Sequence, residues 1–143
     1  MLDSILLVDD ENLLHLVFED ACSLLDISLN LMAIDNADAA ETHFAGLVKD
    51  NKPKPDCIFV DLNIIGSSFD GIELVRRINF KHGDGVVIGI ISSSDDEAEQ
   101  AKAVKAGAQF WIIKSDEIEP RLEEFVKDLN GYKERTAPFK VYR

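Results

Sequence analysis

The sequence predicts an α/β domain with a parallel sheet, and two observations carry this prediction. Short runs rich in leucine and β-branched residues alternate with segments of helical period, which is typical of strand–helix units around a parallel sheet. Most of the strand candidates are also continuously apolar, as expected of strands that helices cover on both faces. With 143 residues, of which 46% are hydrophobic, the chain is long enough for one domain with a sizeable core.

Five strand candidates can be counted along the chain. A repeat of this length suits a doubly wound, five-stranded parallel sheet of order 2-1-3-4-5, the flavodoxin-like (βα)5 arrangement. In that arrangement ligands gather at the carboxyl edge, between the first and third strands. The strand candidates are Ile5 to Val8, Leu29 to Ile34, Cys57 to Val60, Val86 to Ile91 and Phe110 to Ile113.

Two segments show the apolar face of an amphipathic helix, and polar residues mark the start of two other helices. Asp70 with Glu73, and Ser94 with Glu97, have the spacing that satisfies free N–H groups in a first helical turn. We therefore assign these residues to capping. The apolar faces consist of Leu14, Val17, Phe18, Ala21 and Leu25 early in the chain, and of Ile118, Leu122, Phe125, Val126 and Leu129 late in it.

Residues 131–143 differ in charge from the rest of the chain. They carry one acid and four bases, whereas the whole chain has 27 acids and 15 bases. We expect Gly131 to end the last helix and Pro138 to prevent its simple continuation. The sequence thus predicts a domain over residues 1–130 and a basic C-terminal extension over residues 131–143.

The formal net charge of −12 argues against nucleic acid as a ligand and favours cations. Cys22 and Cys57 lie far apart and form no C-x-x-C pair, so the sequence predicts neither a disulfide framework nor a zinc site. No apolar run approaches the roughly 18 residues of a membrane helix, and no signal-peptide pattern opens the chain. We therefore expect a cytoplasmic protein.

Chemically specific polar residues directly follow the first, third, fourth and fifth strand candidates. Asp9 and Asp10 follow the first, Asp61 the third, Ser92 the fourth and Lys114 the fifth. Because these strands are neighbours in the predicted order, the side chains should meet in one crevice. Three carboxylates repel one another and need positive charge, which Lys114 and a hard divalent cation such as Mg²⁺ or Mn²⁺ would supply.

This set of residues suits phosphoryl transfer. With a cation bound, Asp61 can act as a nucleophile toward phosphorus, as carboxylates do in aspartyl-phosphate chemistry. The Ser92 hydroxyl could donate a hydrogen bond to one phosphoryl oxygen, and Lys114 could pair with another.

Several motifs resemble those of the response regulator receiver family, the phosphoacceptor domains of two-component signalling. The resemblance extends from residue 3 to about residue 130 and implies the doubly wound fold. Its motifs are Leu7-Val8-Asp9-Asp10-Glu11, Val60-Asp61-Leu62-Asn63 with Asp70-Gly71-Ile72-Glu73-Leu74, Ile91-Ser92-Ser93, and Ala106-Gly107-Ala108 leading to Lys114.

The resemblance implies a magnesium-dependent phosphoacceptor. Asp61 would be the phosphorylated residue, and Asp9 and Asp10 would hold Mg²⁺ together with Asp61 and the backbone carbonyl of Asn63. A sensor histidine kinase or a phosphotransfer protein would donate the phosphoryl group. The protein would promote only its own phosphorylation and dephosphorylation, and so would not be an enzyme.

The resemblance also implies a way to signal. Lys114 would pair with the phosphoryl oxygens, and Ser92 and Trp111 would form a switch pair that responds to them. A downstream protein would bind the face formed by the fourth helix, the fifth strand and the fifth helix. The protein would be a monomer or a weak homodimer, with neither nucleic acid nor membrane as a partner.

Three features depart from the usual family pattern. The interval between Asp61 and Asp70 is longer, which enlarges the loop from Asn63 to Phe69 over the site. Ser115 follows Lys114 where the family usually has proline, so we expect a trans peptide bond there. The C-terminal extension lies beyond the usual end of the domain.

Three rival functions fit the residues less well. A receiver-like interaction module that works without phosphorylation would not need intact Asp10, Asp61, Ser92 and Lys114. A phosphatase resembling the haloacid dehalogenase group would need Asp-x-Asp at the first strand, which this chain lacks. A flavin carrier of the same topology binds a phosphate where this chain has acids, and no glycine-rich nucleotide motif is present.

Overall fold

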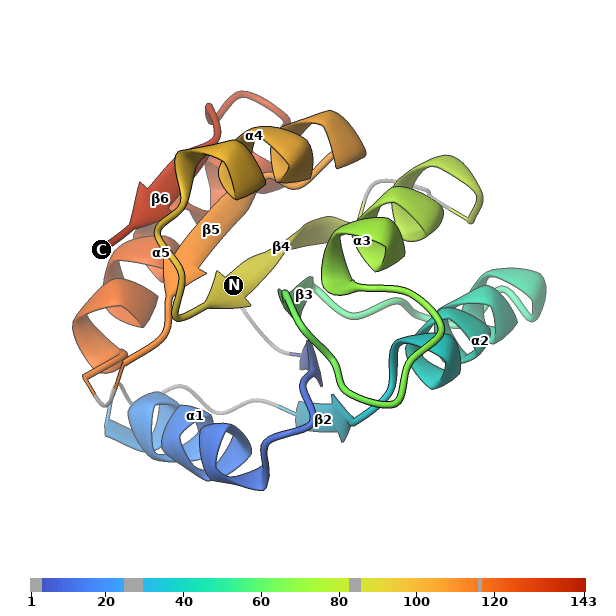
Figure 1. Ribbon diagram of the computed structural model, residues 1–143, viewed down its shortest axis with the longest axis horizontal. Coiled ribbons are helices and arrows are strands. Elements are labelled where there is room, and N and C mark those ends of the chain that lie inside the picture. Colours follow the sequence, from blue (N-terminus) through green and yellow to red (C-terminus); the bar gives the residue numbers. More distant parts are fainter. Residues whose placement is uncertain (1–3, 25–29, 83–85, 116) are drawn as a thin grey trace.

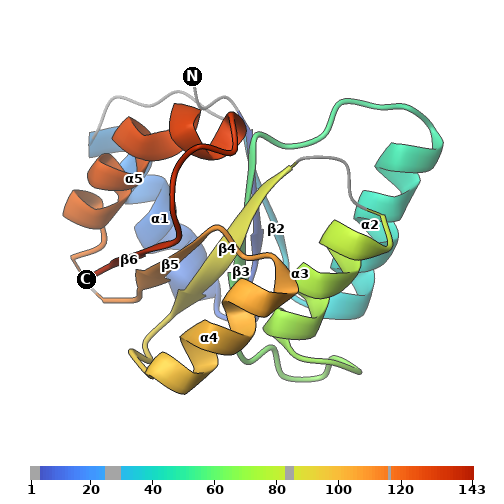
Figure 2. The same cartoon turned by 90° about the horizontal axis from the view of Figure 1, so that it is seen from above.

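The computed structural model describes residues 4–24, 30–82, 86–115 and 117–143. Within these ranges the chain forms a parallel sheet of order β2-β1-β3-β4-β5-β6 with helices on both faces (Figure 1). Figure 2 shows α1 and α5 on one face of the sheet and α2, α3 and α4 on the other. The doubly wound α/β fold predicted from the sequence is therefore confirmed.

The elements alternate along the chain as expected, and the five predicted strands form with ends within one residue of the prediction. Leu29, the first residue of the second candidate, lies outside the described residues. The strands are β1 (Ser4–Val8), β2 (Asn30–Ile34), β3 (Cys57–Asp61), β4 (Val87–Ser92), β5 (Phe110–Ile113) and β6 (Lys140–Tyr142). The helices are α1 (Asn12–Leu24), α2 (Ala37–Lys49), α3 (Gly71–Phe80), α4 (Glu97–Ala106) and α5 (Glu119–Lys133).

Two apolar cores lie on the two faces of the sheet. On the side of α1 and α5, the rings of Phe59, Phe110 and Phe125 pack edge to face or tilted at centroid distances of 4.5 to 5.3 Å. Both predicted helical faces contribute to this core, although the side chain of Leu14 and all of Leu25 lie outside the described residues. The other core lies under α2, α3 and α4 and includes Trp111.

One of the two predicted helix caps is correct. Asp70 caps α3 and accepts a hydrogen bond from the Glu73 amide at 2.8 Å. Ser94 does not cap α4, because the helix begins at Glu97 after its cap Asp96. The Ser94 hydroxyl instead accepts from the Asp96 amide at 3.2 Å, which adds a turn before the helix.

The C-terminal extension corrects two expectations, namely that the last helix ends at Gly131 and that the sheet has five strands. Helix α5 does not end at Gly131 but continues to Lys133, and the chain then returns and adds β6 beside β5. Gly131 serves the return, since its carbonyl accepts from the amides of Thr136 and Ala137 at 2.9 and 3.0 Å. A Cβ at Gly131 would lie 3.0 Å from that of Ala137. The glycine therefore allows close packing inside the helix rather than ending it.

Length and hydropathy decide whether a helix can span a membrane. None of the helices that the structure describes is both long and apolar enough to cross a bilayer.

Candidate functional site

The strand register brings the predicted site residues to one edge of the sheet. Val8 on β1 is level with Val60 on β3, so Asp9 and Asp61 follow at the same height. Ser92 ends β4, and the Lys114 amide, directly after β5, donates to the Ser92 carbonyl at 2.7 Å. Parallel strands of this order thus gather these polar side chains at their carboxyl ends, as the sequence predicts.

Four carboxylates form one acidic cluster at this edge. One oxygen from each of Asp9, Asp10, Glu11 and Asp61 can be chosen so that all lie within 4.8 Å of one another. Asp9 and Asp61 are buried, each with 6% of its surface exposed, whereas Glu11 is exposed. Glu11 was not among the predicted site residues, although the unbroken run of acids from Asp9 to Glu11 could have indicated it.

Lys114 neutralises part of this cluster. Its Nζ lies 3.1 Å from Asp9 Oδ2, 3.3 Å from Glu11 Oε1 and 3.4 Å from Asp61 Oδ1. Burial alone would lower the pKa of Lys114, but the charges of Asp61 and Asp9 outweigh it and raise the pKa. The lysine therefore stays charged, and it is shared by more carboxylates than it can balance.

The buried acids show the resulting imbalance. Burial, followed by the charge of Asp9, raises the pKa of Asp61 from 3.8 to about 6. Burial also raises the pKa of Asp9, although the Glu11 amide donates to its Oδ1 at 2.6 Å. Burial and the neighbouring acids thus disfavour the charged forms of Asp61 and Asp9. Such shifted pKa values are typical of functional sites.

Helix α3 fixes the backbone that carries Asp61. The Gly71 amide donates to the Leu62 carbonyl at 3.0 Å, and a Cβ at Gly71 would lie 2.0 Å from the Asp61 carbonyl oxygen. Only glycine allows the helix to start this close to β3. The Asp70-Gly71 pair therefore serves two purposes, a helix cap and a close approach to the site.

Hydrogen bonds attach the enlarged loop after Asp61 to Asp10 and to the start of α2. The Ile65 amide donates to Asp10 Oδ2 at 3.2 Å, and the Ser67 hydroxyl accepts from the Ala37 amide at 2.8 Å at the start of α2. The Ile65 side chain is 83% exposed beside the acidic cluster. Asn63 lies in this loop with an exposed side chain, and the role of its carbonyl as a metal ligand stays a prediction.

The two residues predicted to form a switch pair are linked through Ser94. The Ser92 hydroxyl accepts from the Ser94 amide at 3.1 Å, and the indole N–H of Trp111 donates to the Ser94 carbonyl at 3.0 Å. Trp111 is fully buried on the side of α3 and α4. A movement of Ser92 would therefore reach Trp111 through the turn that contains Ser94.

The bond after Lys114 is trans, as predicted for Ser115 in place of proline. No peptide bond among the described residues is cis. The Ser115 hydroxyl accepts from the Glu117 amide at 3.2 Å and also contacts Arg121, and Lys114 still reaches the acidic cluster.

The acidic cluster fits a small divalent cation. Mg²⁺ binds oxygen ligands at about 2.1 Å, so two oxygens on one ion lie at most about 4.2 Å apart. The spread of 4.8 Å among the four carboxylates is close to this limit. The donor set consists of carboxylate oxygens, which is the chemistry that Mg²⁺ and Mn²⁺ prefer.

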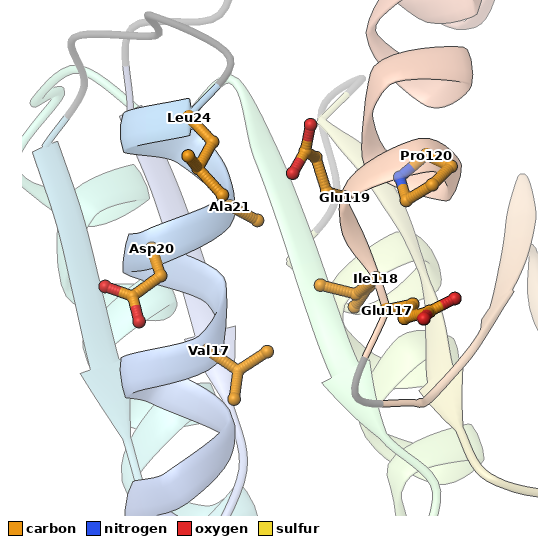
Figure 3. Close-up of a pocket in the computed structure, with 8 residues that line it drawn as sticks. All are labelled: Val17, Asp20, Ala21, Leu24, Glu117, Ile118, Glu119 and Pro120. Carbon is orange, nitrogen blue, oxygen red and sulfur yellow. The ribbon is translucent and has the colours of Figure 1, made fainter.

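A separate groove lies between α1 and the start of α5 (Figure 3). Its volume is about 470 Å³, and none of the acidic-cluster residues lines it. Five apolar and three acidic residues line it: Val17, Asp20, Ala21, Leu24, Glu117, Ile118, Glu119 and Pro120.

Comparison with known proteins identifies the family. The sequence matches the family model of the response regulator receiver domain over residues 5–125. The chain therefore belongs to this family, whose members are signalling modules of two-component systems rather than classical enzymes. Receiver domains bind Mg²⁺ or Mn²⁺ at an acidic pocket, and the described part of this chain contains a cluster of acidic residues. A comparison with curated protein sequences finds no match.

Solved structures of response regulators share the fold. NtrX from Brucella abortus in complex with ADP has a TM-score of 0.74 at 24% identity, and the match covers 94% of this chain and 29% of NtrX. The Mn²⁺-bound form of Rcp1 has a TM-score of 0.65 at 22% identity, covering 90% of each chain. The phosphorylated cyanobacterial phytochrome response regulator RcpA has a TM-score of 0.69 at 20% identity, covering 96% of this chain and 97% of RcpA.

Proposed function

We propose that this receiver domain accepts a phosphoryl group on Asp61 from a histidine kinase or a phosphotransfer protein, with Mg²⁺ bound, and then signals by protein contact. The observation that carries the proposal is the acidic cluster around Asp61, in which Lys114 lies 3.4 Å from the acceptor carboxylate. Reduced, buried Cys22 and Cys57 support a role in the cytoplasm. The Mn²⁺-bound form of Rcp1 and phosphorylated RcpA, which share the fold, also support it.

Each residue has a role in the transfer. An oxygen of Asp61 attacks phosphorus, the bond between phosphorus and the donor nitrogen breaks, and the electron pair of that bond leaves with the donor imidazole. Lys114 pairs with a phosphoryl oxygen, and Ser92 donates a hydrogen bond to another. Asp9, Asp10, Asp61 and the Asn63 carbonyl would hold the cation, which supplies positive charge to the crowded oxygens.

The same geometry supports a route for output. Ser92 is joined to Trp111 through Ser94, and these residues lead to the face formed by α4, β5 and α5. We place the contact with a downstream protein on this face. In this chain the face also contains β6, which covers the edge of β5.

Intact-mass analysis after incubation with acetyl phosphate or phosphoramidate tests the proposal. Wild-type protein should gain one phosphoryl group in the presence of Mg²⁺. Asp61→Asn should stay unmodified over the same time. Asp50→Asn, which changes an exposed acid at the end of α2, is the matched control and should react like wild type. An unmodified wild type would favour an interaction module that works without phosphorylation. An Asp61→Asn variant modified as fast as wild type would refute Asp61 as the acceptor.

A further inference from the structure

Strand β6 occupies the edge of β5 with both of its faces engaged. Val141 is level with Trp111 and packs into the core under α3 and α4, whereas Tyr142 is buried in the core under α1 and α5. The tyrosine is only 1% exposed. The strand therefore packs into both cores through its side chains and does not only contact the surface.

Helix α5 offers hydrogen-bond and charge partners to the polar groups of this strand. Tyr132 donates its hydroxyl to Tyr142 at 2.8 Å, and Tyr142 donates to Asp128 Oδ2 at 2.7 Å. Lys140 pairs with Asp128 at 3.1 Å and also with Glu124. The side of α5 that faces β6 is therefore acidic and suits an extended segment that begins with a base.

Arg143, directly after β6, connects the strand to the turn that follows β4. Its Nε and Nη2 donate to Asp95 Oδ2 and Oδ1 at 2.7 and 3.1 Å. Asp95 follows Ser94, whose amide donates to the Ser92 hydroxyl and whose carbonyl accepts from Trp111. One turn of chain thus joins the site, the indole and the C-terminal strand.

We propose that residues 139–143 are a detachable strand of this receiver: they occupy an interaction surface formed by the β5 edge and the acidic side of α5 in the unphosphorylated chain, and phosphorylation of Asp61 loosens them. The proposal rests on the phosphorylation put forward above. The surface thus has a resident occupant of defined chemistry: an extended segment in which Lys140 and Arg143 flank Val141 and Tyr142.

The coupling runs through the Ser92 hydroxyl. A phosphoryl group on Asp61 attracts this hydroxyl. When the hydroxyl rotates toward the phosphoryl group, it loses the hydrogen bond from the Ser94 amide. The turn of Ser94 and Asp95 then changes its backbone, and the Asp95 carboxylate no longer faces Arg143. Because coupling between two sites is reciprocal, breaking the Arg143 pair must in turn favour the phosphorylated state.

Hydrogen exchange on the full chain tests the first half of the proposal. Beryllofluoride with Mg²⁺ serves as the phosphoryl mimic, and exchange is followed by mass spectrometry in peptides covering residues 139–143. Exchange of the β6 amides should rise about threefold or more when the mimic binds, as in local opening of a structural unit. If the mimic binds and these amides exchange as before, or more slowly, the proposal is wrong.

The affinity for beryllofluoride tests the reciprocal half. Arg143→Gln and Asp95→Asn should each bind the mimic roughly twofold to fivefold more tightly than wild type, the range expected for one exposed ion pair. The double variant should show no further gain. Lys127→Gln removes an exposed base from α5 outside this network and should bind like wild type.

The two proposals fail in different ways. If no mimic binds and acetyl phosphate leaves Asp61 unmodified, the proposed function fails. If Asp61 is phosphorylated and the mimic binds, but Arg143→Gln and Asp95→Asn bind it no more tightly than Lys127→Gln, then β6 is a fixed part of the sheet and the detachable strand is refuted. Far-ultraviolet circular dichroism of each variant separates this result from loss of fold.

Discussion

Two groups of carboxylates in this chain differ in how their charge is balanced. At the edge of the sheet, four acids lie close together, and Lys114 forms ion pairs with three of them, Asp9, Glu11 and Asp61. Between α2 and α3, Glu41 and Glu73 are in contact with two arginines, a lysine and a histidine. The first group carries excess negative charge. In the second, here called the matched group, the bases are numerous enough to offset both acids.

The pKa values follow this difference. Burial and the charge of Asp9 raise the pKa of Asp61 to about 6. Hydrogen bonds from Arg76 and Arg77 lower the pKa of Glu73 to about 2. Burial alone would raise the pKa of Glu41, but the hydrogen bonds from His82 and Arg77 outweigh it and lower the pKa. The same chemical group thus contributes to stability between the helices and opposes it at the site, where a cation is expected to bind.

Adding Mg²⁺ should give the largest effect on this comparison. A ligand that binds only the native state raises the free energy of unfolding by about 2.7 kcal/mol at 100 times its Kd. Asp10→Ala removes one repelling carboxylate, so without metal it should melt higher than wild type by about 3 °C, or roughly 1 kcal/mol. The variant should gain little when Mg²⁺ is added.

Thermal melts with EDTA and with Mg²⁺ measure both quantities. Glu41→Gln serves as a control, because it removes an acid from the matched group and should leave the response to Mg²⁺ unchanged. An equal response to the metal in wild type and Asp10→Ala would show that the acidic cluster is not the metal site.

The pH dependence of metal-free protein should give the next largest effect. The folded pKa of Asp61, about 6, lies above its usual value of 3.8, so the folded state binds the proton more tightly. The free energy of unfolding should therefore rise as the pH falls from 7 through 6 toward 4, by on the order of 2 kcal/mol from this residue. Urea unfolding of wild type and Asp61→Asn in EDTA isolates the term, since the variant should lack it.

Much of the fold was predictable because strand and helix patterns are local. The strand Phe110–Ile113 was placed to the residue, since a short, wholly apolar run between helical segments has few other structures open to it. The sixth strand was missed because Lys140–Tyr142 has no such pattern. Its position depends on Tyr142 reaching Tyr132 and Asp128, which are contacts that only the folded chain provides.

The site was predictable in its members and less so in its connections. Parallel order alone brings Asp9, Asp61 and Lys114 together, because strand ends are fixed by the apolar runs that precede them. The pair of Asp95 with Arg143 joins residues 48 positions apart and leaves no trace in the sequence. The error at Ser94 is of the same kind, since two polar residues, Ser94 and Asp96, compete to cap one helix.

Neutralising Glu41 should have a smaller effect, opposite in sign to that of Asp10→Ala. Glu41→Gln loses charged partners at Arg77 and His82, 3.0 and 2.8 Å away, and should lower the free energy of unfolding at pH 7 by about 1 kcal/mol. Because the folded pKa of Glu41 is lowered, its contribution is present above pH 4.5 and is lost as the pH falls through that folded pKa. Glu123→Gln, at an exposed pair, should change stability by less than about 0.5 kcal/mol in urea unfolding.

The smallest expected effect is a change in Trp111 fluorescence when a phosphoryl group or its mimic binds at the acidic cluster. Trp111, the only tryptophan, is fully buried and donates its indole N–H to the Ser94 carbonyl at 3.0 Å. A phosphoryl group on Asp61, or beryllofluoride with Mg²⁺, should draw Ser92 away from Ser94 and so change the polarity that the indole senses. The fluorescence emission should therefore shift on binding, and Ser92→Ala should keep the fold but weaken the shift. If wild-type emission stays constant while the mimic is bound, Trp111 is only a core residue. The signal then reaches the surface without passing through the turn of Ser94.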